Sequence, residues 1–169
     1  MSYTRFSDVM LKAYPAYKWE PITVTTNDDY KLMLFHVWNE EKRKELGAQG
    51  PILFQHGTGQ DGVNFLSEYG MTETLPGPAV QIQFADLGYD VYLGNNRGTE
   101  YSLGHADFST ASDNPSVFWD FTLDGLALDV LANSKAMTEN ATGGNSKGWY
   151  FGYSQGTIQA LIALAKYET

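Results

Sequence analysis

Cysteine is absent from the 169-residue chain. Disulfide bonds, thiolate metal sites, iron–sulfur clusters and cysteine nucleophiles are therefore excluded. Positive charge is scarce too, with 11 Lys and Arg residues against 20 Asp and Glu residues and a formal net charge of −9. An acidic surface repels phosphate backbones, so we expect no nucleic-acid partner. The sequence shows no metal-ligand cluster and no phosphate-binding glycine loop, so we expect neither a metal ion nor another cofactor.

Long hydrophobic runs are also missing. No apolar stretch approaches the roughly 20 residues that a membrane-spanning helix needs. Residues 1–10 lack the cationic start and the following apolar stretch of a signal peptide. The sequence patterns themselves therefore indicate neither a membrane span nor a particular cellular compartment.

Core-forming residues are plentiful, since 43% of the chain is hydrophobic and 14% is aromatic. That is enough for one domain with a sizeable core. Short β-rich runs alternate with helical patterns, which predicts an α/β fold with a mainly parallel sheet flanked by helices. Residues 1–20 are weakly patterned and are expected to form an N-terminal arm or a short helix. Residues 21–169 are expected to form the α/β core.

The predicted helices and strands are mostly short. An antiparallel hairpin is expected from residues 22–26 and 30–38, because turn residues separate two β-rich runs. The charged residues 40–50 are expected to form a loop. Buried parallel strands are predicted at residues 51–55, 89–93 and 149–151, and helices at residues 79–88, 116–134 and 158–167.

The pentapeptide Gly-x-Ser-x-Gly occurs at residues 152–156. A predicted strand precedes it and an Ala- and Leu-rich helix follows, which is the setting of a nucleophile elbow. Gly152 and Gly156 leave room for a tight turn that would expose the hydroxyl group of Ser154. The N-terminus of the following helix would bring a positive dipole to a developing oxyanion. Ser154 is therefore the predicted nucleophile, and the alternative is a glycine-rich turn with a helix-capping serine.

A second candidate segment, His56-Gly57-Thr58, directly follows a predicted buried strand. A backbone N–H in this loop can face the Ser154 hydroxyl and, together with the N–H of Gln155, form an oxyanion hole. We predict Thr58 as the donor, because Gly57 allows the backbone to approach closely. His56 has the side chain of a catalytic base, but at the foot of this loop we interpret it as a structural hydrogen-bonding residue.

Four segments resemble motifs of the acid lipases, the gastric and lysosomal lipases and sterol-ester hydrolases of the α/β-hydrolase fold. They are Pro-Ile-Leu-Phe-Gln-His-Gly at residues 51–57, Phe-Ala-Asp-Leu-Gly-Tyr-Asp-Val-Tyr-Leu-Gly-Asn-Asn-Arg-Gly at 84–98, Phe-Trp-Asp-Phe-Thr-Leu-Asp at 118–124 and Gly-Tyr-Ser-Gln-Gly-Thr at 152–157. They occur in the family's order, and the resemblance covers most of the chain from about Tyr14 onward.

The resemblance implies hydrolysis of an apolar carboxylic ester, such as a triacylglycerol or a sterol ester, through an acyl-enzyme on Ser154. Asn96 and Arg97 follow a predicted strand at its carboxyl end, where they are expected to brace the site. The resemblance also suggests a lysosomal, secreted or lipid-associated protein. The chain departs from the family at Gly125, where a glutamate is usual, and at Tyr153, where a histidine is usual.

A Ser–Asp–His triad in that chain order is also implied, yet residues 155–169 contain neither Asp nor His. His36, His56 and His105 precede the serine, and none occupies the place expected of the base. The α/β-hydrolase core would thus stop after the nucleophile helix, without the lid or the later strands. The acid and the base would come from a complementing polypeptide beside the strand from Trp149 to Phe151, either the protein's own C-terminal segment or another subunit. The alternative is a catalytically inactive lipase-like subunit with a structural role in a larger assembly.

Overall fold

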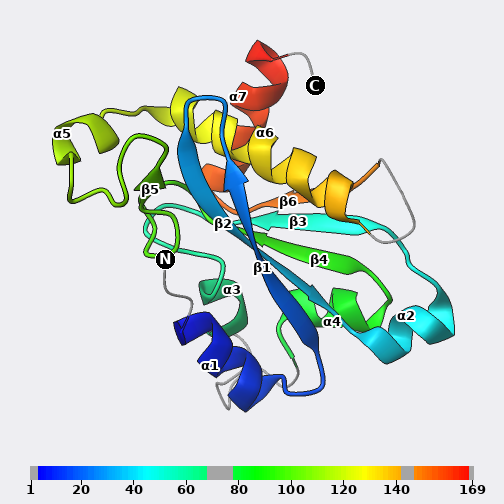
Figure 1. The fold of residues 1–169 in the computed structure, drawn as a ribbon. Helices are drawn as coiled ribbons and strands as arrows, with labels where there is room; N and C mark the ends of the chain where they lie inside the picture. The colour runs from blue at the N-terminus through cyan, green and yellow to red at the C-terminus, as the bar shows by residue number, and fades with distance from the viewer. Residues whose placement is uncertain (1–3, 68–77, 142–146, 168–169) are drawn as a thin grey trace.

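The computed structural model describes residues 4–67, 78–141 and 147–167. Within these ranges the elements follow one another in the order shown in Figure 1. They are α1 (Thr4–Ala13), β1 (Lys18–Thr25), β2 (Tyr30–Trp38), α2 (Glu40–Leu46), β3 (Pro51–Gln55), α3 (Asn64–Ser67), α4 (Val80–Asp86), β4 (Asp90–Gly94), β5 (Gly104–His105), α5 (Pro115–Phe118), α6 (Leu123–Asn140), β6 (Trp149–Gly152) and α7 (Gln155–Lys166).

A single mixed sheet organises these elements, with strand order β1-β2-β4-β3-β6 and β5 paired with β2. Strands β4, β3 and β6 run parallel to one another, as expected for βαβ units. The predicted hairpin of β1 and β2 is present, and it joins β4 antiparallel. This is the predicted α/β fold, with β1 and β6 at the two edges of the described sheet.

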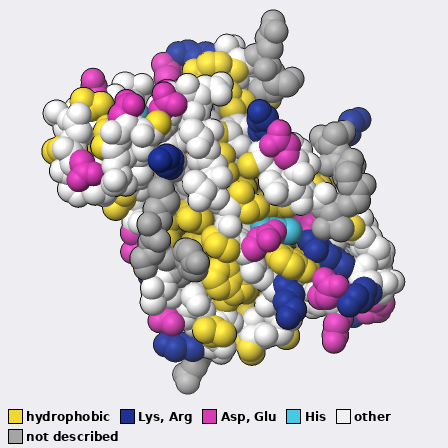
Figure 2. Space-filling view, viewed as in Figure 1, with side chains coloured by type: hydrophobic (Ala, Val, Ile, Leu, Met, Phe, Trp, Pro, Cys, Tyr) yellow, Lys and Arg dark blue, Asp and Glu magenta, His cyan; other side chains and the backbone are white. Residues whose placement is uncertain are grey.

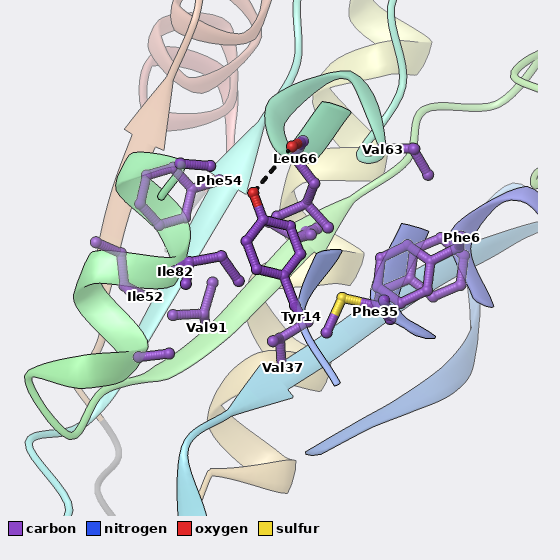
Figure 3. Close-up of a cluster of buried hydrophobic side chains, with 14 of the residues drawn as sticks. Phe6, Tyr14, Phe35, Val37, Ile52, Phe54, Val63, Leu66, Ile82 and Val91 are labelled. Atoms are coloured by element: carbon purple, nitrogen blue, oxygen red, sulfur yellow. Dashed lines mark hydrogen bonds between the residues drawn. The ribbon is translucent and has the colours of Figure 1, made fainter. Parts of the chain in front are cut away.

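Both faces of the sheet are covered by helices, with α1, α3 and α4 on one face and α6 and α7 on the other (Figure 1). Alternate side chains of a strand point to opposite faces. In β2, Phe35 and Val37 therefore belong to the core under α1 and α4, whereas Leu34 belongs to the core under α6. Figure 3 shows the first of these cores, in which the Tyr14 hydroxyl donates to the Leu66 carbonyl oxygen at 3.2 Å.

Most of the expected arm packs against the sheet. Helix α1 buries Phe6 and Met10 completely, and the Phe6 ring stacks on Phe35 with 3.8 Å between the ring centroids. Strand β1 begins at Lys18, so the last residues of the expected arm already belong to the sheet. None of the helices in the described ranges combines the length and the apolar character needed to cross a bilayer.

The prediction of a loop at residues 40–50 is wrong, because helix α2 occupies the first part of this segment. The side-chain oxygen of Asn39 caps this helix by accepting from the backbone N–H groups of Glu41 and Lys42. An ion pair between Glu40 and Lys44 spans one helical turn. No side chain of α2 is buried, and its charged groups gather on the surface in Figure 2. Capping and charge pairing, rather than an apolar stripe, explain this helix.

The single long helix predicted at residues 116–134 is also wrong. The chain instead forms the short helix α5, a break at residues 119–122, and then α6, which continues to Asn140. Thr122 is the N-cap of α6, and its side-chain oxygen accepts from the backbone N–H of Asp124 at 3.3 Å. The break leaves Trp119 and Phe121 outside the helices, next to the site described below.

Candidate active site

Ser154 occupies the sharp turn between β6 and α7 that the sequence predicts. Its backbone has φ 51° and ψ −115°, a region that non-glycine residues seldom adopt. Its side chain is exposed and makes no capping hydrogen bond to the helix. The turn therefore presents the hydroxyl group outward, and a helix-capping role does not describe this serine.

The two glycines of the pentapeptide stand where the backbone is crowded. A Cβ atom at Gly152 would lie 2.7 Å from the backbone nitrogen of Thr157. A Cβ atom at Gly156 would lie 2.5 Å from the carbonyl oxygen of Gln55, at the end of β3. The same carbonyl accepts from the N–H of Tyr153 at 3.0 Å. The spacing of the motif thus reflects the close approach of the turn and α7 to the neighbouring strand.

The loop after β3 lies directly beside Ser154. A Cβ atom placed on Gly57 would be 3.0 Å from the Ser154 Cβ, so only a glycine fits without a shift. Thr58 and Gln155, the two predicted donors, line one cavity of about 450 Å³. In the described part of the chain, the backbone N–H of neither residue donates a hydrogen bond. Two unused N–H groups therefore border the same cavity near the serine.

His56 is fixed by backbone groups on both of its ring nitrogens. Nε2 accepts from the N–H of Asn96 at 3.1 Å, so the ring proton resides on Nδ1, which donates to the Gly57 carbonyl at 2.8 Å. Burial lowers the pKa of His56 and favours this neutral form. Its side chain thus connects the loop after β3 to the loop after β4, in the manner expected of a structural histidine.

The other two histidines are also engaged away from Ser154. His36 lies between carboxylates, with Nδ1 at 2.9 Å from Glu20 Oε1 and Nε2 at 2.9 Å from Asp90 Oδ1. His105 pairs with β2 through β5, and its Nδ1 accepts from the N–H of Asp107 at 3.2 Å. The structure brings neither imidazole to the serine as a hydrogen-bond partner.

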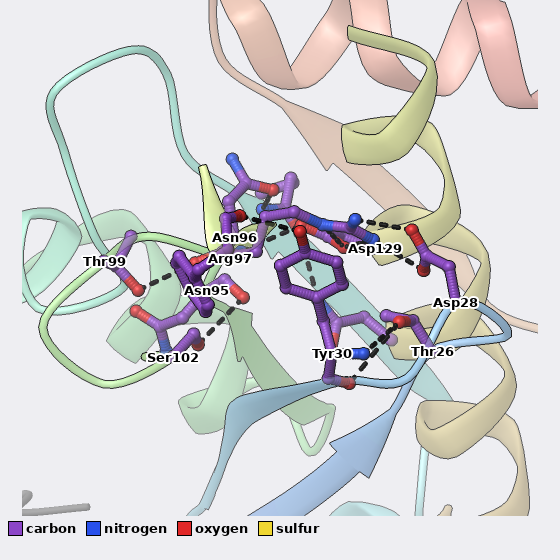
Figure 4. Close-up of polar contacts among 12 residues, drawn as sticks. Thr26, Asp28, Tyr30, Asn95, Asn96, Arg97, Thr99, Ser102 and Asp129 are labelled. Carbon is purple, nitrogen blue, oxygen red and sulfur yellow. Dashed lines mark hydrogen bonds and ion pairs between the residues drawn. The ribbon is translucent and has the colours of Figure 1, made fainter. Parts of the chain in front are cut away.

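Arg97 anchors the loop after β4, and its side chain is completely buried (Figure 4). Its Nε donates to Asp129 Oδ1 at 2.8 Å, and its backbone N–H donates to Asp129 Oδ2 at the same distance. The two terminal nitrogens donate to the carboxylate of Asp28 at 2.6 and 2.9 Å. The guanidinium also lies 3.8 Å from the centre of the Tyr30 ring.

This ion-pair cluster contains two carboxylates, Asp28 and Asp129, that no sequence pattern connects with Arg97. Burial opposes the charged form of Arg97, but hydrogen bonds and charges from Asp28 and Asp129 raise its pKa overall. Asp28 lies in the turn between β1 and β2, and Asp129 is a carboxylate on the buried face of α6. The predicted brace at Asn96 is held separately, because its Oδ1 accepts from Gln55 Nε2 at 2.9 Å.

No group of three or more His, Asp or Glu side chains suited to a metal ion occurs in the ranges that the structure describes. The site itself presents an exposed hydroxyl group, two backbone N–H donors and a cavity.

Known lipases resemble this chain over most of its length. A family model described as a partial alpha/beta-hydrolase lipase region matches residues 11–69. Lipase member M of Mus musculus is 33% identical over 156 residues, which cover 91% of this chain and 34% of that protein. Triacylglycerol lipase 1 of Arabidopsis thaliana is 37% identical over 145 residues, which cover 85% of this chain and 33% of that lipase. Gastric triacylglycerol lipase of Bos taurus is 32% identical over 158 residues, which cover 93% and 37%. The chain spans about a third of the length of these curated relatives.

Solved structures share the fold at low sequence identity. An esterase of Pyrococcus furiosus aligns with a TM-score of 0.58 at 17% identity, and the alignment covers 96% of this chain and 50% of the esterase chain. An epoxide hydrolase of Solanum tuberosum aligns with a TM-score of 0.54 at 20% identity, and the alignment covers 86% of this chain and 35% of the epoxide hydrolase. These structures show the α/β-hydrolase fold, and the lipase matches support placing the chain in the acid lipase family, as the N-terminal part of such a protein.

Proposed function

We propose that the protein hydrolyses apolar carboxylic esters, such as triacylglycerols or sterol esters, through an acyl-enzyme on Ser154. The observation that carries this proposal is the exposed, uncapped hydroxyl of Ser154 on a backbone turn with φ 51°, beside a cavity lined by Thr58 and Gln155. Strain at a single exposed serine is typical of a nucleophile elbow. The names of the lipase relatives support the ester substrate.

The chemistry follows from the groups at the turn. The Ser154 Oγ attacks the ester carbonyl carbon and gives its proton to a base, while the carbonyl π electrons move onto oxygen. The N–H groups of Thr58 and Gln155 would stabilise that oxyanion. When the intermediate collapses, the alcohol leaves with the proton held by the base and an acyl-serine remains. Attack by water then releases the carboxylic acid and restores the hydroxyl.

The base and its acid are proposed to come from a complementing polypeptide, either the protein's own C-terminal segment or another subunit. Both ring nitrogens of His56 and both of His36 already contact other groups, so neither imidazole is available to accept the Ser154 proton. A serine without a base is a weak nucleophile at neutral pH. The lipase relatives are about three times as long as this chain, which leaves ample sequence for both groups in such proteins.

The proposed place of this polypeptide is the open side of the sheet. Strand β6 pairs only with β3 within the described sheet, and Trp149 and Phe151 are 66% and 45% exposed. On α7, Leu161 and Leu164 are exposed one helical turn apart, at 62% and 65%. Covering several hundred Å² of such surface would contribute on the order of 10 kcal/mol, at about 25 cal/mol per Å².

Labelling with a fluorophosphonate probe tests the nucleophile. In the complete protein, we expect the probe to label Ser154, because the serine oxygen displaces fluoride from phosphorus and forms a stable adduct. Ser154→Ala should abolish both labelling and ester hydrolysis, with a loss of at least about 10³-fold in kcat/KM. Ser116→Ala, a change at an exposed serine on α5, should leave both unchanged. Absence of labelling in the intact, assembled protein would instead favour the inactive structural subunit.

Expression of residues 1–169 alone tests the need for a complement. We expect this chain to self-associate and to bind a hydrophobic dye, because Leu161 and Leu164 remain in water. Replacing both by glutamine should reduce association, as measured by sedimentation. Leu11→Gln, at a 66% exposed leucine of α1 on the other face of the sheet, should not. A soluble wild-type monomer that unfolds cooperatively would contradict this part of the proposal.

A further inference from the structure

The cavity beside Ser154 is lined by aromatic side chains as well as by the predicted oxyanion donors. Trp119, Phe121 and Leu126 line the same cavity as Thr58 and Gln155. Of these three apolar side chains, Leu126 is buried, whereas the Trp119 side chain is 51% exposed. A half-exposed indole at the rim of a cavity is an apolar surface available to a ligand.

Trp119 is held in this position by close contacts. A Cβ atom on Gly98 would lie 2.6 Å from Cζ3 of the indole, so the ring rests directly on the backbone of the loop after β4. Gly98 has φ 86°, which further favours glycine there. The rings of Phe118 and Phe121 lie 5.0 and 6.0 Å from Trp119, measured between centroids. The indole is therefore supported from several directions while about half of it remains open.

We infer that Trp119 determines acyl-chain specificity, together with Phe121, by forming the apolar surface against which the acyl chain of the ester lies. This inference rests on the proposed function. The acyl carbonyl carbon would be bonded to Ser154 and its oxygen would face the N–H groups of Thr58 and Gln155. The acyl chain thus starts at the cavity that these residues line, and it stays there after the alcohol has left.

The aromatic surface favours long apolar chains over short ones. Each methylene group that moves from water onto the rings gains hydrophobic free energy, and acetate has no such groups to place there. The break between α5 and α6 is what brings the indole to the cavity, because residues 119–122 leave the helical path. Trp119 is thus a specificity-determining residue, while the bond-making steps stay with Ser154.

The test compares p-nitrophenyl octanoate with p-nitrophenyl acetate in the complete protein. We expect Trp119→Ala to lower the octanoate-to-acetate ratio of kcat/KM by at least about tenfold. Trp119→Phe, which keeps an aromatic ring, should restore most of this ratio. Val117→Ala, a matched truncation of an exposed apolar side chain that does not line the cavity, should leave the ratio unchanged.

Two results would overturn the inference. One is an unchanged ratio in Trp119→Ala, or an equal loss for both esters, which would mean that the indole only supports the loop. The other is a selective loss that appears when the alcohol chain of acetate esters is lengthened and is absent from the acyl series. Fluorophosphonate labelling of each variant separates these outcomes from failure of the proposed function, in which wild-type Ser154 itself would remain unlabelled.

Discussion

Replacement of Arg97 by methionine is expected to destabilise the protein by about 3–5 kcal/mol, which is much of the stability of a typical domain. The guanidinium satisfies the carboxylate of Asp129, whose side chain is completely buried, and it also binds Asp28. Without the Arg97 side chain, the completely buried carboxylate of Asp129 would lose its ion-pair partner. Urea denaturation should show a lower midpoint with an unchanged m value.

Two further variants make this prediction specific. Arg97→Met combined with Asp129→Leu should recover a large part of the loss, because the uncompensated charge is then removed. Lys166→Met serves as a matched control, since Lys166 pairs with Asp124 at 2.6 Å but both side chains are about half exposed. That substitution should cost less than about 1 kcal/mol. If Arg97→Met and Lys166→Met lowered the free energy of unfolding by similar amounts, the buried cluster would contribute no more to stability than an exposed ion pair.

Gly156→Ala is expected to be the second severe change, with a loss of about 2 kcal/mol or more despite the better helix propensity of alanine. The added methyl group would lie 2.5 Å from the Gln55 carbonyl oxygen and 3.0 Å from that of His56. Both atoms belong to the backbone, so α7 must move away from β3 and carry the Ser154 turn with it. Thermal unfolding should show the loss, and fluorophosphonate labelling should slow as well.

Gly125→Ala provides the matched helical control. A methyl group at Gly125 would lie 3.2 Å from Arg97 Nη1 and 3.3 Å from Phe121 Cβ, so these two side chains, and no backbone atom, would have to shift by a few tenths of an ångström. The gain in helix propensity, about 1 kcal/mol, works against that small cost. We therefore expect a change within about 1 kcal/mol. Equal unfolding temperatures for Gly156→Ala and the wild type would contradict the crowding at the turn.

The nucleophile turn could be predicted from the sequence because its determinants are local. Strand, Gly152, Ser154, Gly156 and helix follow one another within a short stretch of chain, and the glycines mark where side chains do not fit. Strands β1 to β4 and β6 could be predicted in a similar way, as short β-rich or apolar runs between turn residues, whereas the two-residue strand β5 was not predicted. Features that depend on residues close together in the sequence are the ones that a single sequence predicts best.

The Arg97 cluster could not be predicted in the same way. Arg97 is separated from Asp28 by 69 residues and from Asp129 by 32, and nothing in the sequence pairs these three. The helix break had a local signal, Thr122 followed by Asp124, but the apolar residues on both sides of it suggested one continuous helix. Likewise, the contact between Trp119 and Gly98 exists only once the fold has brought two distant loops together.

The backbone conformation of Ser154 lowers the stability of the fold while it exposes the reactive hydroxyl group. A non-glycine residue at φ 51° and ψ −115° loses about 1–3 kcal/mol of stability, and the side chain regains none of it by capping α7. Glycine would hold the same turn without steric strain. At residue 154, the exposed hydroxyl group is thus kept at a cost in stability. Selection for thermal stability alone would favour replacement of Ser154 by glycine, which removes the hydroxyl group.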